Sequence, residues 1–235
     1  MGKEFEIRRE VEVNATPEEV WEAVATPEGL AAWLFPLPTD PDSIKVSERP
    51  NRLLVRDEGP DGFFNQLEYV IEGRGGGTTK LRYVHSGIIT ENWDDQYDAV
   101  NQHTDFYLHT LGQYLEHFNG RSATYIGGGP EGLNGPESST AADALTTLRG
   151  ALGLDDGAGE GARARIEPEG LDPVEGVVDY ARGPFIGVRS GDALYRFFGR
   201  NAWGGPVGMS IHHFGSVDEG EQTEAWQGWL NRVFA

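Results

Sequence analysis

The sequence predicts an α+β protein in which an antiparallel sheet packs against a long C-terminal helix, and it predicts this arrangement twice along the chain. The long helix is expected over 93–118, where apolar side chains recur at three- and four-residue steps and so share one stripe. The sheet is expected from segments in which apolar and charged residues alternate, beginning with 3–13. The repetition is expected because short stretches of the first half recur in the same order in the second.

The first half is expected to run from one strand through two short helices into four strands and the long helix. Thr16-Pro17 and Thr26-Pro27 each place a capping hydroxyl before a proline at the first helical position. Turn residues rich in Pro and Gly then separate four expected strands, at 43–48, 51–57, 63–73 and 78–86. The long helix, capped by Asn92 or Asp94, is expected to cover the apolar face of this sheet.

The apolar stripe of the long helix changes character along its length. It is wholly apolar from Tyr107 onward, but it carries Asn101 and Thr104, next to Tyr97, near its start. Because buried polar side chains need partners, this part of the helix is expected to face a cavity, a ligand or water. The sequence therefore predicts a pocket beside the first half of the helix.

Three segments of the first half resemble a known family. They are ATPEEVWEAVATPEGLAAWLFP, KLRYVHSGI and NWDDQYDAVNQHTDFYLHTLGQYLEHF, and they resemble the activator-of-heat-shock-protein-ninety-ATPase-like branch of the SRPBCC superfamily. The resemblance covers about residues 3–122 and implies the helix-grip fold that START domains and Bet v 1-like allergens share. It implies a function among lipid and hormone carriers, aromatase/cyclases and co-chaperones. The chain departs from bacterial relatives at His103-Thr104-Asp105-Phe106, where they often carry a Gly-Trp pair.

The second half is interpreted as a degenerate copy, which gives a helix-grip domain over 1–122 and a second α+β domain over 123–235. LLVRDEG, KLRYVHSG and QYLEHF are echoed, in the same order, by IGVRSGD, GMSIHHFG and GWLNRVF. After a turn-rich segment at 127–140, the expected elements are a helix at 141–154, strands at 163–168, 174–181, 184–189, 193–199 and 206–214, and a helix at 221–234, with 123–126 as the first strand. The alternative is an unrelated α+β extension.

Composition excludes several classes of function. The chain has 19 basic and 38 acidic residues, a net charge of −19, so binding to nucleic acid is not expected. It has no cysteine, so it has neither disulfides nor thiolate metal sites, which fits a reducing compartment. Apolar runs are too short to span a membrane and no signal peptide is recognised, so we expect a cytoplasmic protein without membrane insertion.

Candidate ligand-binding residues come from the predicted sheet face and the start of the long helix. His85 shares a strand face with Leu81 and Tyr83, so it can point into the pocket; the alternative is a histidine at the rim, bonded to a loop. Large aromatic residues can form either pocket walls or plain core. The expected ligand-binding set is Trp33, Tyr69, Tyr83, His85, Tyr97, Asn101 and Thr104.

No pattern of residues indicates a metal, a cofactor or catalysis. Asp105 and His109 stand four residues apart on the long helix, but no third ligand follows at a recognisable spacing. His212 and His213 are neighbours on a predicted strand and must point to opposite faces. We therefore assign no catalytic residue, metal or cofactor from the sequence.

Three classes of function remain open. The leading one is non-catalytic binding of a small hydrophobic or amphipathic molecule in a helix-grip cavity. The first alternative is a co-chaperone-like module that binds a chaperone or another protein. The second is a cyclase- or hydrolase-like enzyme that uses a pocket histidine or tyrosine as acid or base.

Overall fold

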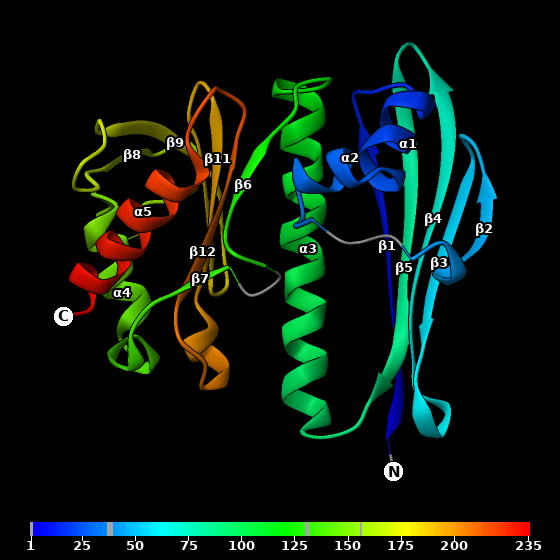
Figure 1. Ribbon diagram of the computed structural model, residues 1–235, viewed down its shortest axis with the longest axis horizontal. Helices are drawn as coiled ribbons and strands as arrows, with labels where there is room; N and C mark the ends of the chain where they lie inside the picture. The colour runs from blue at the N-terminus through cyan, green and yellow to red at the C-terminus, as the bar shows by residue number, and fades with distance from the viewer. Residues whose placement is uncertain (1, 37–39, 130–131, 156) are drawn as a thin grey trace. The chain divides into compact units, whose positions relative to one another are not determined.

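The computed structural model describes residues 2–36, 40–129, 132–155 and 157–235 (Figure 1). The chain divides into two compact units, Met1–Arg121 and Ser122–Ala235. Each unit contains one antiparallel sheet and ends in a helix. Among the described residues, no helix is both long and apolar enough to cross a membrane.

The first unit contains a five-stranded sheet in the order β1-β5-β4-β3-β2. Its strands confirm the five predicted ones within a few residues: β1 (Lys3–Val13), β2 (Ile44–Glu48), β3 (Arg52–Glu58), β4 (Phe64–Gly75) and β5 (Thr78–Ile89). The register places Tyr69 opposite Tyr83, and Ile7 opposite His85. Since alternate residues of a strand share a face, these side chains line the same side of the sheet.

Two short helices, α1 (Pro17–Ala25) and α2 (Pro27–Ala31), connect β1 to β2, as predicted. Thr16 and Glu19 form a reciprocal capping box at the start of α1, with the Thr16 backbone nitrogen donating to Glu19 Oε2 at 2.7 Å. The Thr26 hydroxyl caps α2 by accepting from the Gly29 nitrogen at 3.0 Å. The capping residues read from the sequence therefore set both helix starts.

The long helix α3 (Trp93–His117) packs along β1 and β5. Asn92 occupies the N-cap position, as predicted, but with a left-handed φ of 44° its side chain makes no capping bond. Asparagine tolerates this conformation better than most residues, which explains its presence there. The buried surface of α3 is also wider than the predicted stripe, since Phe106 and Thr110 are 0% and 1% exposed.

Arg9, a charged residue on the inner face of β1, connects this strand to α3. Arg9 Nε lies 2.5 Å from Asp105 Oδ1, and its Nη2 donates to Asn101 Oδ1 at 2.8 Å. The Arg9 side chain is 29% exposed, so the ion pair sits at the edge of the core. It fixes the position of the helix across the first strand.

The second unit contains a sheet in the order β6-β12-β11-β10-β9-β8, with β7 also pairing with β12. Its elements are β6 (Thr124–Ile126), β7 (Leu133–Asn134), η3 (Glu137–Thr140), α4 (Ala144–Ala151), β8 (Arg163–Ile166), β9 (Val174–Arg182), β10 (Phe185–Arg189), β11 (Ala193–Phe198), η4 (Arg200–Trp203), β12 (Gly208–His213) and α5 (Glu219–Val233). The predicted strands and helices are confirmed, although the turn-rich segment at 127–140 also contributes β7 and η3.

The two units follow the same path. In each, the first strand pairs with the last, a meander returns from the last strand outward, and a terminal helix follows. The sequence echoes fall on equivalent elements, since 53–59 and 186–192 begin in β3 and β10, while 80–87 and 208–215 lie in β5 and β12. The protein is thus a tandem pair of helix-grip folds, and the second has a divided first strand and the extra edge strand β8.

The second unit is densely packed under its terminal helix. Trp226 and Trp229 of α5 lie with ring centroids 5.2 Å and 6.0 Å from Tyr195 and Phe197 of β11. All four side chains are at most 5% exposed. Aromatic residues therefore fill the face that is partly lined by polar groups in the first unit.

The opposite face of the second sheet carries a buried ion pair across three strands. Arg196 Nη1 of β11 donates to Asp179 Oδ1 of β9 at 2.6 Å, and the two side chains are 1% and 4% exposed. Gly187 of β10 lies between them, and a Cβ at this position would collide with both Arg196 Nη1 and Asp179 Oδ1. A glycine here makes room for the ion pair.

Candidate functional site

Three of the predicted ligand-binding residues come together on the inner face of the first sheet. Tyr69 of β4 and Tyr83 of β5 lie directly opposite each other, with ring centroids 5.3 Å apart. His85 is the next inward residue of β5, with its ring 6.4 Å from Tyr83 and 5.0 Å from Phe5 of β1. Strand alternation and register build this aromatic wall, which we define as Tyr69, Tyr83 and His85.

His85 is held as a neutral imidazole. Its Nε2 lies 2.8 Å from Asn65 Oδ1 on β4. Because an amide oxygen only accepts, this assignment of the amide puts the ring hydrogen on Nε2 and leaves Nδ1 as an acceptor. Burial lowers the pKa of His85 to about 4, so the ring is uncharged at neutral pH.

The two tyrosines of the wall offer hydroxyls that the protein does not use. Tyr69 and Tyr83 are 2% and 9% exposed, and burial raises the pKa of both phenols. Within the described part of the chain, neither hydroxyl has a hydrogen-bond partner. Neither hydroxyl oxygen is completely shielded from solvent, so a small molecule can contact both. The wall thus combines apolar rings with neutral polar groups.

The helix side of the site is contributed by α3. Burial, Tyr69 and Tyr107 all raise the pKa of Tyr83, and the Tyr107 ring meets Phe35 edge-on at 6.3 Å. The sequence analysis placed Tyr107 on the apolar stripe of the helix. It did not include Tyr107 or Asn65 among the ligand-binding residues. The signal for Asn65 was its spacing of four from Tyr69, which puts both residues on the same strand face.

The other four predicted residues have partners within the fold. Tyr97 stacks on Trp93 at 4.7 Å and packs against the cluster around Phe5. Asn101 accepts from Arg9, a partner that the sequence did not reveal. Two remaining donors bond to nearby carbonyls: Thr104 Oγ1 to Val100 O and Trp33 Nε1 to Ala23 O, both at 2.8 Å.

Metal-binding groups do not gather in the described residues. In these ranges, no three His, Cys, Asp or Glu side chains are placed to hold an ion. His212 is 1% exposed with its ring 5.4 Å from Tyr125, whereas His213 Nε2 lies 3.6 Å from Asp192. As successive residues of β12 they point to opposite faces, as expected.

No family description and no curated protein matches this chain. Similar solved structures include the Aha1 dimer from Colwellia psychrerythraea, which is 16% identical with a TM-score of 0.39 over 48% of this chain and 96% of that one. DynU16, from the dynemicin biosynthetic locus, is 19% identical with a TM-score of 0.38 over 97% of this chain and 95% of that one. CalU16 from Micromonospora echinospora is 20% identical with a TM-score of 0.37 over 48% of this chain and 76% of that one.

Because all three TM-scores are below 0.5, the fold assignment rests on the strand order and helices described above. The names of these proteins say nothing about what this chain binds.

Proposed function

We propose that the first unit binds a small, uncharged, mainly apolar molecule against the wall of Tyr69, Tyr83 and His85. The carrying observation is that both tyrosine hydroxyls lack partners although their side chains are at least nine-tenths buried. A hydrogen bond contributes about 0.5–1.5 kcal/mol, so a guest that bonds to one of these hydroxyls gains affinity and orientation. The rings around the hydroxyls provide apolar contact for the rest of the guest.

The electrostatics of the wall favour an uncharged guest. Burial holds His85 deprotonated and both phenols protonated at neutral pH. The nearest cation on this face, Arg9, already uses all three of its nitrogens, in bonds to Asp105, Asn101 and the Arg8 carbonyl oxygen. A charged guest would lose its hydration without gaining a counterion.

The same geometry favours binding over catalysis and over protein docking. A general base works best with a pKa near the operating pH, whereas the pKa of His85 is about 4. A docking surface for a protein needs an exposed apolar patch. Among the described residues, only one large hydrophobic side chain, Phe63, is strongly exposed, at 40%.

A neutral fluorescent probe tests this proposal. N-phenyl-1-naphthylamine should bind the full chain saturably, with fluorescence enhancement at one site. Leu67 lies opposite His85 in the register and is half-buried, so the larger side chain of Leu67→Trp should cover the wall and weaken uptake at least tenfold. Val70→Trp is the matched control, because Val70 lies on the same strand but faces the other side.

The proposal fails if the wild-type chain shows no saturable uptake. It also fails if Leu67→Trp and Val70→Trp have equal effects while both variants melt cooperatively. Thermal melts of both variants therefore accompany the titrations.

A further inference from the structure

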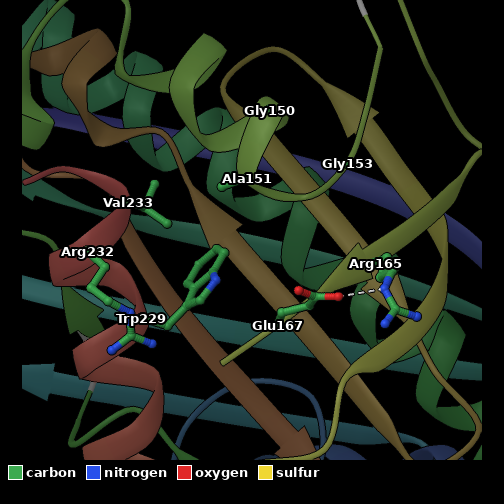
Figure 2. A pocket seen from close by; sticks show the side chains of 8 residues that line it. All are labelled: Gly150, Ala151, Gly153, Arg165, Glu167, Trp229, Arg232 and Val233. Atoms are coloured by element: carbon green, nitrogen blue, oxygen red, sulfur yellow. Dashed lines mark hydrogen bonds and ion pairs between the residues drawn. The ribbon is translucent and has the colours of Figure 1, made fainter. Parts of the chain in front are cut away.

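A pocket of about 460 Å³ lies in the second unit, between the end of α4, the edge strand β8 and the end of α5 (Figure 2). Its lining consists of Gly150, Ala151, Gly153, Arg165, Glu167, Trp229, Arg232 and Val233. The volume is in the range of small-molecule sites, which span about 300–1,000 Å³. None of these residues belongs to the wall in the first unit.

Trp229 gives the pocket a fixed hydrogen-bond donor. Its side chain is 5% exposed, and its ring is held between Phe197 and Trp226 at 6.0 Å and 5.8 Å. Within the described residues the Trp229 Nε1 has no hydrogen-bond partner, and this atom is accessible to solvent. An indole nitrogen only donates, so the pocket offers a rigid N–H to an acceptor.

Two arginines at the rim, each ion-paired to glutamates, offer further N–H donors. Arg165 pairs with Glu175 and, through Nε at 2.8 Å, with Glu167; Arg232 Nη1 lies 3.1 Å from Glu169. The arginine side chains are 53% and 47% exposed, and exposed ion pairs contribute little stability. Each guanidinium has five N–H donors, so both can bond to a ligand without leaving these partners.

We propose that this pocket binds a small carboxylate with a compact apolar body. One carboxylate oxygen accepts from the Trp229 N–H, and the charge is met by the guanidinium of Arg232 or Arg165. The body lies against Ala151 and Val233. Figure 2 shows Trp229 between Arg232 and Glu167 in this view. Glu167, the single acidic residue of the lining, opposes the bound anion.

Removing a positive charge from the pocket and removing a negative one should change carboxylate affinity in opposite directions. Binding of 4-fluorophenylacetate to the full chain is followed by ¹⁹F NMR. Arg232→Gln should weaken binding about tenfold, because it removes a bond to a charged group. Glu167→Gln should tighten binding several-fold, because it removes a like charge. Trp229→Phe keeps an aromatic ring, removes the N–H and should also weaken binding about tenfold.

Two controls separate this site from general electrostatics and from the first unit. Arg163→Gln removes the same charge from β8 at a residue outside the lining, so it should change affinity less than twofold. Neutral 4-fluorophenylacetamide should bind wild type and Arg232→Gln equally. The proposal is overturned by absence of saturable carboxylate binding, by equal effects of Arg163→Gln and Arg232→Gln, or by weakening in Glu167→Gln. If Trp229→Phe does not fold, the variants at the exposed residues Arg232 and Glu167 still test the proposal.

Discussion

The imidazole Nε2 of His85 lies 2.8 Å from Oδ1 of Asn65 on the neighbouring strand. This contact fixes the ring against the inner face of the first sheet, beside Phe5. Burial keeps the folded-state pKa of His85 near 4, below the value of about 6.5 for an exposed histidine. The folded protein therefore holds a neutral histidine that the unfolded chain would protonate in mild acid.

This difference predicts a pH dependence of stability. Between pH 6.5 and 4 the unfolded chain binds a proton at His85 that the folded chain does not, so the free energy of unfolding falls as pH falls. At about 1.4 kcal/mol per pKa unit, the loss reaches at most about 3 kcal/mol. Urea unfolding at pH 7 and 4.5 should show a smaller loss in His85→Gln than in wild type. Equal losses would place His85 in a solvated environment.

Asn101→Leu tests the connection between α3 and β1. The change removes the acceptor of Arg9 Nη2, while Arg9 keeps Asp105. We expect a loss of about 0.5–1.5 kcal/mol in the free energy of unfolding and unchanged uptake of the neutral probe. Gln102→Leu is the control, because the Gln102 side chain donates within the helix, to Asp98. Full stability with weakened uptake in Asn101→Leu would make Asn101 a ligand contact instead.

Gly187→Ala tests the buried ion pair of the second sheet. The added Cβ would collide with Arg196 and Asp179, so the protein should lose about 1–3 kcal/mol of stability through overpacking. Gly191→Ala is the matched control, since no atom lies within 4 Å of the added Cβ. Chemical denaturation of both variants measures the difference. Similar stabilities would mean that the ion pair shifts to accommodate a methyl group.

The tandem interpretation predicts that residues 1–122 fold alone. This fragment contains a complete five-stranded sheet, two connecting helices and α3. Circular dichroism should show a cooperative thermal transition for the isolated fragment. A fragment that remains unfolded would show that the two halves depend on a shared core.

The sequence predicted the elements of the fold well because local signals agreed with one another. Alternation located β1, and the capping hydroxyls of Thr16 and Thr26 located two helix starts. The position of Asn92 at the start of α3 was predictable, but its left-handed backbone conformation, without a side-chain capping bond, was not. The pairing partner of the broken strand β6/β7 also depends on tertiary contacts.

The site was predictable only in part. Alternation put Tyr83 and His85 on one face, and the register brought Tyr69 to them. Asn65 as the partner of His85 required that register, which the sequence does not specify. Thr104 was predicted to contact a ligand, but its hydroxyl bonds to a carbonyl of its own helix. The spacing of residues in a sequence cannot distinguish these two arrangements.

We propose that the Tyr83 hydroxyl forms a hydrogen bond with a neutral ligand. A matched pair of ligands tests this hydrogen bond most directly. Naphthalene and 2-naphthol share a ring system, but only the second can hydrogen-bond. By equilibrium dialysis, Tyr83→Phe should reduce the preference for 2-naphthol about 2- to 10-fold and leave naphthalene affinity unchanged, with no loss of stability. An unchanged preference, or a variant destabilised by more than about 1 kcal/mol, would contradict the account.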